Sequence, residues 1–180
     1  MEPRSPEYSP SLPPPYAPAP AAFAGQAYYA CWSGCDERYP LTEVRYRCQR
    51  CGGLLDVRHD LEALRRRGSA EWRALFDDRA RPGRTPGVHS GVWGKREWVC
   101  PQLADEHIVS LGEGWSPLLP VPRLGDALGV RDLLIKQCGH SHTGSFKDLG
   151  MTVLVSVVQA LNAARRAEGR APVPAVACAS

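Results

Sequence analysis

A long apolar run near the end of the chain, entered through a loop of small and polar residues, constrains the fold most. Residues 151–166 (MTVLVSVVQALNAARR) contain no proline or glycine and predict a helix of about 22 residues, roughly 33 Å long. Ser145 and Asp148 form an S-x-x-D pattern that is typical of a helix start, which would place Lys147 in the first helical turn.

Strand candidates flank this helix on both sides. The segments concerned are Leu118–Val121 and Leu133–Lys136 before the helix and Val173–Ala179 after it. A strand, a helix and a second, parallel strand make a βαβ unit with a right-handed crossover. The pattern therefore predicts an α/β fold.

Lys147 has the surroundings of a functional amine. The positive end of the helix dipole disfavours a cation there, and a neutral amine is the form that attacks a carbonyl group. The preceding residues 140–145 (HSHTGS) suit a loop that faces a ligand, and Lys95 and Lys136 are the only other lysines. A solvated lysine on an exposed helix face is the commoner alternative.

Several blocks of sequence resemble the threonine synthase family, whose members are pyridoxal-phosphate enzymes of the tryptophan-synthase-β fold, also called fold type II. Residues 140–156 (HSHTGSFKDLGMTVLVS) are similar to the family's lysine motif, and residues 111–118 (LGEGWSPL) to its opening motif. The plant-type branch is indicated by Leu149 and by the segments 51–64 (CGGLLDVRHDLEAL), 72–79 (WRALFDDR) and 90–99 (SGVWGKREWV). The blocks occur in the family's order, from about Tyr28 to Ser180.

The resemblance implies a reaction: conversion of O-phospho-L-homoserine and water to L-threonine and phosphate, by elimination and water addition. Lys147 would hold the pyridoxal 5'-phosphate and act in catalysis, with Phe146 and Ser145 beside the cofactor. By motif position, Ser116, His142 and Thr143 are substrate-binding candidates. A small-molecule substrate and a homodimer of the full-length protein are also implied.

The chain departs from the family pattern at a few positions. Ser116 stands where the family usually has threonine. Plant members are activated by S-adenosylmethionine, in a pocket with an asparagine and a lysine where this chain has Pro117 and Asp126, so that regulation is not expected. The family's loops for the substrate carboxylate and the cofactor phosphate are not found before Ser180. We therefore expect an N-terminal fragment of a longer enzyme that is inactive alone.

Four cysteines nearer the N-terminus have the spacing of a metal site. Cys31-x3-Cys35 and Cys48-x2-Cys51 are separated by twelve residues, and each pair can present two thiolates from one turn. This predicts a zinc ribbon over residues 28–59, with a short strand at Leu41–Arg47. Four thiolates leave no open position for water, so the zinc would be structural. Unmetallated thiols are the alternative.

The remaining segments are assigned from composition. Residues 1–27 predict a disordered Pro-rich tail. Residues 60–107 predict a helical and loop connection with helices at Asp60–Arg67 and Ala70–Asp77, capped by Asp60 and Ser69. The truncated N-terminal part of the catalytic domain, the start of a doubly wound sheet, would occupy residues 108–180. Expected buried or packed side chains are Trp93, Trp98, Trp115, Cys100, Cys138 and Cys178.

Composition excludes several classes of protein. The net charge of +3 is too small to indicate nucleic-acid binding, and no stretch approaches the roughly 20 apolar residues of a membrane helix. Seven cysteines without a secretory signal favour a reducing compartment, so a cytoplasmic location is expected.

Two other functions stay open at this point. A related fold type II enzyme, such as cysteate synthase or threonine dehydratase, would keep the lysine and change the substrate loops. A non-enzymatic zinc-ribbon binding module would rest on the four cysteines and the Pro-rich tail. Acidic residues such as Glu37 and Glu43 dilute the positive charge that such a module would need.

Overall fold

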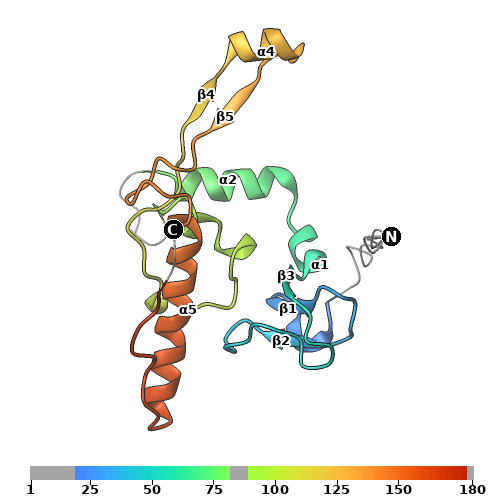
Figure 1. The fold of residues 1–180 in the computed structure, drawn as a ribbon, viewed down its shortest axis with the longest axis vertical. Helices are drawn as coiled ribbons and strands as arrows, with labels where there is room; N and C mark the ends of the chain where they lie inside the picture. Colours follow the sequence, from blue (N-terminus) through green and yellow to red (C-terminus); the bar gives the residue numbers. More distant parts are fainter. Residues whose placement is uncertain (1–18, 82–88, 178–180) are drawn as a thin grey trace, which may run out of the picture. The chain divides into compact units, whose positions relative to one another are not determined.

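The fold is mixed α/β and divides into two compact units. The computed structural model describes residues 19–81 and 89–177. The first unit comprises residues 1–63 and the second residues 64–180, and each is described by itself. Figure 1 shows the elements of both units along the chain.

The first unit is built on a three-stranded antiparallel sheet of order β2-β1-β3. Its strands are β1 (Ala27–Cys31), β2 (Arg38–Pro40) and β3 (Leu55–His59). Tyr29 of β1 lies opposite Tyr39 on one side and Val57 on the other. The central strand is almost wholly buried, and the core of the unit forms around it.

The prediction of a strand at Leu41–Arg47 is wrong. Strand β2 ends at Pro40, and the Glu43 N–H donates to the Pro40 carbonyl at 3.1 Å, which turns the chain away from the sheet. Alternation of apolar and polar side chains indicated a strand, but no strand among the described residues pairs with this segment. The following residues carry the turns around Cys48.

Part of the expected disordered tail is folded. Residues 1–18 lie outside the described residues, whereas residues 19–27 include a short 3-10 helix, η1 (Ala21–Phe23), and the start of β1. The Phe23 ring stacks on Tyr28 at 5.0 Å, and the Gly25 N–H donates to Asp60 Oδ2 at 2.8 Å. An aromatic contact and a buried carboxylate thus extend the fold N-terminally of the boundary that composition suggested.

Two helices follow the first sheet. In α1 (Leu61–Arg65), Asp60 caps the helix as predicted, because the Ala63 N–H donates to Asp60 Oδ1 at 3.2 Å. In α2 (Ser69–Arg79), the prediction that Ser69 is the cap is wrong, since Gly68 occupies that position. The Gly68 N–H instead donates to the Glu71 carboxylate at 2.9 Å, which serves the same end of the helix.

Helix α2 packs against the short 3-10 helix η2 (Trp93–Trp98) through aromatic rings. The Trp98 ring lies 5.5 Å from Trp72 and 4.9 Å from Phe76, in edge-to-face geometry. Arg79 also forms a bidentate ion pair with Glu97, at 2.8 and 2.7 Å. These contacts hold the 90–99 segment in place.

The packing expected of the remaining tryptophans and cysteines is confirmed only in part. Trp93 is 1% exposed and Cys100 is buried, whereas Trp98 and Trp115 are about half exposed and Cys138 is partly buried. Cys178 lies outside the described residues.

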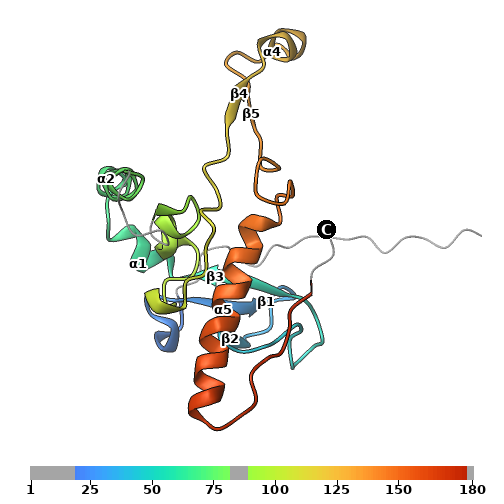
Figure 2. The same cartoon turned by 90° about the vertical axis from the view of Figure 1, so that its left-hand side faces the viewer.

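Two strands and a helix form a hairpin-like arm in the second unit. Strands β4 (Leu118–Pro120) and β5 (Leu134–Lys136) pair antiparallel, with Leu119 opposite Ile135, and α4 (Pro122–Leu128) connects them. Both views show α4 at the far end of this arm (Figures 1 and 2). The two expected strands are thus confirmed, within two residues at their ends.

The prediction of a third strand at Val173–Ala179 is wrong for its described residues, and the predicted βαβ unit is wrong with it. Residues 173–177 are irregular, and residues 178 and 179 lie outside the described part. The Val173 backbone instead exchanges hydrogen bonds with the Asn162 side chain, at 2.7 and 3.3 Å. The described part of this segment pairs with neither β4 nor β5.

Helix α5 (Asp148–Ala167) confirms the long helix, with 20 residues against the expected 22 or so. It starts at Asp148, so Lys147 is the N-cap residue and not part of the first turn. Within the described ranges, no helix is long and apolar enough to cross a membrane.

Candidate active-site lysine and candidate metal centre

Hydrogen bonds across the 141–148 loop fix the backbone that leads to Lys147. The Thr143 N–H and hydroxyl donate to the two Asp148 oxygens, at 2.9 and 2.6 Å. The Ser141 hydroxyl donates to the Ser145 carbonyl at 2.8 Å, and the Lys147 N–H donates to Ser145 Oγ at 3.3 Å. The loop is therefore ordered by its own polar side chains.

Asp148 is the anchor of this loop. The Thr143 hydroxyl and N–H hold the pKa of the Asp148 carboxyl below its usual value. The negative charge lies in the first turn of α5, where the helix dipole favours it. The S-x-x-D pattern thus works mainly through its aspartate, which ties the loop to the helix start.

The Lys147 side chain has no polar partner in the described part of the chain. Its backbone carbonyl accepts the Gly150 and Met151 N–H groups, both at 2.9 Å, so the main chain is fixed. The hydrogen bonds and ion pairs of residues 19–81 and 89–177 do not include its Nζ, and the residue is partly buried. The structure thus presents an uncommitted amine from a rigid base.

The other residues predicted to form the site differ in their exposure to solvent. Ser145 is partly buried, whereas Phe146 is 63% exposed and His142 and Thr143 are exposed. Ser116 lies at the base of the arm, where its carbonyl accepts a hydrogen bond from Lys136 Nζ at 3.3 Å. None of the described hydrogen bonds joins Ser116 to the lysine loop.

A buried hydrogen-bond network clamps α5 just beyond the lysine. Trp93 Nε1 donates to Thr152 Oγ1 at 2.9 Å, and that hydroxyl donates to the Val109 carbonyl at 2.7 Å. The Val109 N–H donates to Ser156 Oγ at 2.9 Å. The segment that leads into the 111–118 motif is thereby attached to the helix that begins with the lysine motif.

Sequence reasoning missed this network. Thr152 and Ser156 are two hydroxyl residues four positions apart on an otherwise apolar helix, so they share one face. Both are almost fully buried in the structure. Buried hydroxyls need partners, so this spacing was an available signal for a second segment packed against that face.

The 111–118 motif is shaped around Glu113, which is 8% exposed. Its carboxylate accepts hydrogen bonds from the Ser110 hydroxyl at 2.5 Å and the Leu111 N–H at 3.1 Å. Burial raises the pKa of Glu113, but these donors outweigh burial and the net shift is downward. The glutamate therefore serves as an internal anchor of the loop.

Gly114 meets the backbone of Gly91 at very close range. A Cβ on Gly114 would lie 2.6 Å from the Gly91 Cα, and Gly114 has φ +99°. Gly112 has a similar φ of +87°, but a Cβ there would meet nothing within 4 Å. Gly112 is thus required only for its backbone conformation, whereas Gly114 is required both for its conformation and for the close contact with Gly91.

We expect Gly114→Ala to destabilise the chain clearly more than Gly112→Ala. Each change costs about 1–2 kcal/mol for the left-handed backbone, and Gly114→Ala adds about 1–3 kcal/mol for the steric overlap. Urea unfolding of both variants measures the difference. Equal midpoints for the two variants would contradict the close approach of residues 91 and 114.

Lys95 makes a second contact between the segment around Gly91 and the 111–118 motif. Its Nζ donates to the Gly91 carbonyl at 3.3 Å and lies 5.2 Å from the centre of the Trp115 ring. Burial, together with the charge of Lys136, lowers the pKa of Lys95. Two of the three lysines thus lie at the base of the arm, and the third starts α5.

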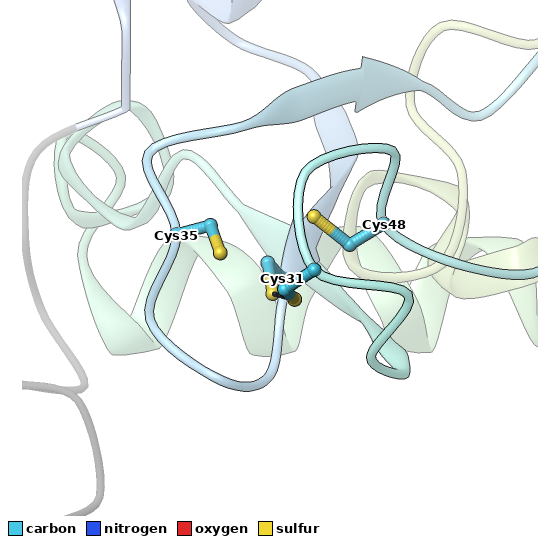
Figure 3. Close-up of side chains that lie close together, drawn as sticks. Cys31, Cys35 and Cys48 are labelled. Atoms are coloured by element: carbon cyan, nitrogen blue, oxygen red, sulfur yellow. Dashed lines mark hydrogen bonds between the residues drawn. The ribbon is translucent and has the colours of Figure 1, made fainter.

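The four cysteines of the first unit converge on one point. Their sulfur atoms all lie within 4.8 Å of one another, and Cys31 Sγ is 3.5 Å from Cys51 Sγ. Figure 3 shows the side chains of Cys31, Cys35 and Cys48 directed toward a common centre. Cys31 and Cys48 are buried, whereas Cys51 is exposed.

Tight turns at glycines place the cysteine pairs. The Gly34 N–H donates to the Cys31 carbonyl at 3.2 Å, and the Gly52 N–H donates to the Cys48 carbonyl at 2.9 Å. Both glycines have positive φ, +83° and +70°, which other residues rarely adopt. Each turn points two thiols to the same side, as the spacing predicted.

The thiols differ sharply in acidity. Burial opposes the ionisation of Cys48, but the N–H groups of Cys51 and Arg50 and the Tyr39 hydroxyl favour it, and its pKa falls to about 6. The neighbouring Cys51, with burial, raises the pKa of Cys35 to about 12. Four adjacent sulfurs cannot all be ionised without a cation between them. The donor set therefore fits a thiophilic metal ion such as Zn²⁺.

Comparison with known proteins agrees with the motif geometry. Residues 109–180 match the family described as pyridoxal-phosphate dependent enzyme. Over 146 residues, 80% of this chain, the sequence is 50% identical to threonine synthase 2, chloroplastic, of Arabidopsis thaliana. The chain is a threonine synthase homologue.

Archaeal threonine synthases show the same similarity. The protein of Methanocaldococcus jannaschii is 36% identical over 122 residues, and that of Methanosarcina acetivorans is 32% identical over 124 residues, in each case 68% of this chain. The match spans about a quarter of each relative, 27% of the Arabidopsis and Methanocaldococcus proteins and 26% of the Methanosarcina protein. The homology therefore concerns one part of a threonine synthase, which includes Lys147.

Proposed function

We propose that this chain supplies the cofactor-binding lysine of a threonine synthase, which converts O-phospho-L-homoserine and water to L-threonine and phosphate. The observation that carries the proposal is the uncommitted Lys147 amine at the N-cap of α5, held by the Thr143–Asp148 hydrogen bonds. The match to the pyridoxal-phosphate family over residues 109–180 supports it.

In this proposal Lys147 has two tasks. Its amine would hold pyridoxal phosphate, which would supply an electron sink for the substrate. Lys147 would also remove the proton at the substrate Cα and return a proton later in the reaction. A side chain that has no competing partner among residues 19–81 and 89–177, on a fixed backbone, suits an amine that must alternate between these tasks.

Neighbouring residues would shape the site. Ser145 and Phe146, whose ring is exposed, directly precede the lysine in sequence, and we propose that they lie beside the cofactor. Ser116 and His142 would face the substrate. Because both polar groups of Thr143 donate to Asp148, we propose that Thr143 chiefly holds the loop and contributes to substrate binding only as an acceptor.

We further propose that Cys31, Cys35, Cys48 and Cys51 hold one structural zinc ion. The mutual sulfur distances within 4.8 Å and the two glycine turns support a tetrahedral site with no open position. Residues 28–59 would then be a zinc-ribbon module that precedes the catalytic part.

We propose the following domain organisation and assembly for the complete enzyme. The arm and α5 would be the start of a doubly wound fold type II domain over residues 108–180, joined to the ribbon by residues 60–107. Residues 1–27 would be a Pro-rich tail that ends in the folded residues 19–27. The complete enzyme would be a homodimer in the cytoplasm, without membrane or nucleic-acid partners.

The test is a substrate assay on a synthase that carries this segment. We expect phosphate and L-threonine to form in equal amounts from O-phospho-L-homoserine, and to fall by at least about 1,000-fold in Lys147→Ala. L-Threonine, O-phospho-L-serine and sulfite are supplied in parallel reactions. Deamination of threonine or formation of cysteate, with no threonine from phosphohomoserine, would replace the proposal with threonine dehydratase or cysteate synthase.

A further inference from the structure

We propose that Tyr39 is a positioning residue of the four-cysteine site, whose hydroxyl donates a hydrogen bond to the Cys48 sulfur and tunes it as a metal ligand. The inference rests on the zinc site proposed above and adds a residue that is not itself a ligand. The Tyr39 hydroxyl lies 3.7 Å from Cys48 Sγ. Both residues are buried, with exposures of 5% and 2%.

The direction of this hydrogen bond follows from the other partner of Tyr39. The Gln49 N–H donates to the Tyr39 oxygen at 2.9 Å. Since the oxygen accepts that bond, its own hydrogen is free to point toward Cys48, where sulfur is the acceptor. One phenol thus contacts the ligand cysteine and the residue that follows it.

The Tyr39 ring is held in place from two directions. Its backbone pairs with Tyr29 in the sheet, and the guanidinium of Arg45 lies 4.2 Å from the ring centre. Arg45 is fixed in turn by Glu43, at 2.9 Å. The hydroxyl is therefore presented by a preorganised ring and does not depend on a flexible side chain.

A hydroxyl here has a definite effect on a metal thiolate. A sulfur bound to zinc keeps negative charge, and Cys48 is shielded from water that could hydrogen-bond to it. A donated hydrogen bond spreads that charge, orients the sulfur and makes it a weaker nucleophile. Such outer partners of metal ligands typically change metal affinity by about 10- to 100-fold.

The experiment compares Tyr39→Phe with Tyr28→Phe in the full 180-residue chain. Tyr28 is a matched control, because it is equally buried, at 4%, on the adjacent strand, and its ring stacks on Phe23. Zinc affinity is measured by competition with a chromophoric chelator. We expect Tyr39→Phe to bind zinc about 10-fold more weakly than the wild-type chain, and Tyr28→Phe to bind it equally well.

A second readout separates positioning from general structural support. Both variants are saturated with Co²⁺, which restores the metal-coupled fold, and the sulfur-to-cobalt charge-transfer band is recorded. A sulfur that has lost its hydrogen bond is richer in electrons, so the band of Tyr39→Phe should move to longer wavelength. Peptide mapping after iodoacetamide treatment should show faster alkylation at Cys48.

Each outcome decides the matter. Equal affinities and equal bands for the two variants overturn the role of Tyr39 and leave the zinc proposal standing, provided that the wild-type chain binds zinc. A wild-type chain that binds no metal overturns both. A Tyr39→Phe chain that takes up no cobalt while Tyr28→Phe does would also overturn the inference, because a positioning hydroxyl adjusts a four-thiolate site and does not create it.

Discussion

Loss of the zinc ion proposed for the four-cysteine site is expected to unfold the sheet of the first unit. The unit has a small apolar core, and metal binding to such modules contributes on the order of 10 kcal/mol to folding. Cys48→Ser should therefore abolish stoichiometric zinc and the antiparallel sheet together. Metal analysis after exhaustive dialysis, with amide hydrogen exchange over residues 27–59, measures both effects.

Cys138→Ser is the matched control for this prediction. Cys138 is a free cysteine outside the cluster, so its replacement should leave one zinc per chain and the exchange pattern unchanged. A wild-type chain that is folded, contains no zinc and shows four freely titrating thiols would contradict the assignment.

Replacement of Lys147 is expected to abolish the covalent attachment of the cofactor in a synthase that carries this segment. Lys147 is the lysine that follows the ordered 141–146 loop, and its amine has no competing partner in the described residues. In Lys147→Ala, the visible absorbance of the attached cofactor should vanish. Borohydride reduction followed by peptide mapping should find no labelled lysine.

Lys136→Ala serves as the control, because Lys136 is already engaged with the Ser116 carbonyl at the base of the arm. This variant should keep both the absorbance and a reducible adduct on Lys147. An adduct that persists in Lys147→Ala, on any other lysine, would show that the motif was assigned the wrong role.

Local patterns predicted the elements whose stability is local. The uninterrupted apolar run predicted α5, and the cap at Asp60 was confirmed because its hydrogen bond reaches only three residues along the chain. The spacing of the four cysteines predicted their convergence, since each pair needs a single tight turn. These features require few contacts between distant parts of the sequence.

Features that depend on distant partners were predicted poorly. The strand at Leu41–Arg47 and the parallel strand at Val173–Ala179 had suitable side-chain patterns, but neither has a neighbour in the described sheets. The cap of α2 was wrong for a different, local reason, because the Glu71 carboxylate accepts the Gly68 N–H three residues away. A pattern of side chains does not specify which backbone groups remain to be paired.

The sequence by itself identified the candidate chemical groups of this protein: an amine at a helix start, four thiols at metal spacing, and motifs of the threonine synthase family. Only the tertiary structure decided which groups support that chemistry. In the structure, Trp93 donates a hydrogen bond to Thr152 and Tyr39 donates one to Cys48. The Lys147 side chain has no polar partner among the described residues. The physical reason is that ligand spacing is a local property of the chain, whereas burial and hydrogen-bond partnership arise only when residues far apart in sequence are packed together.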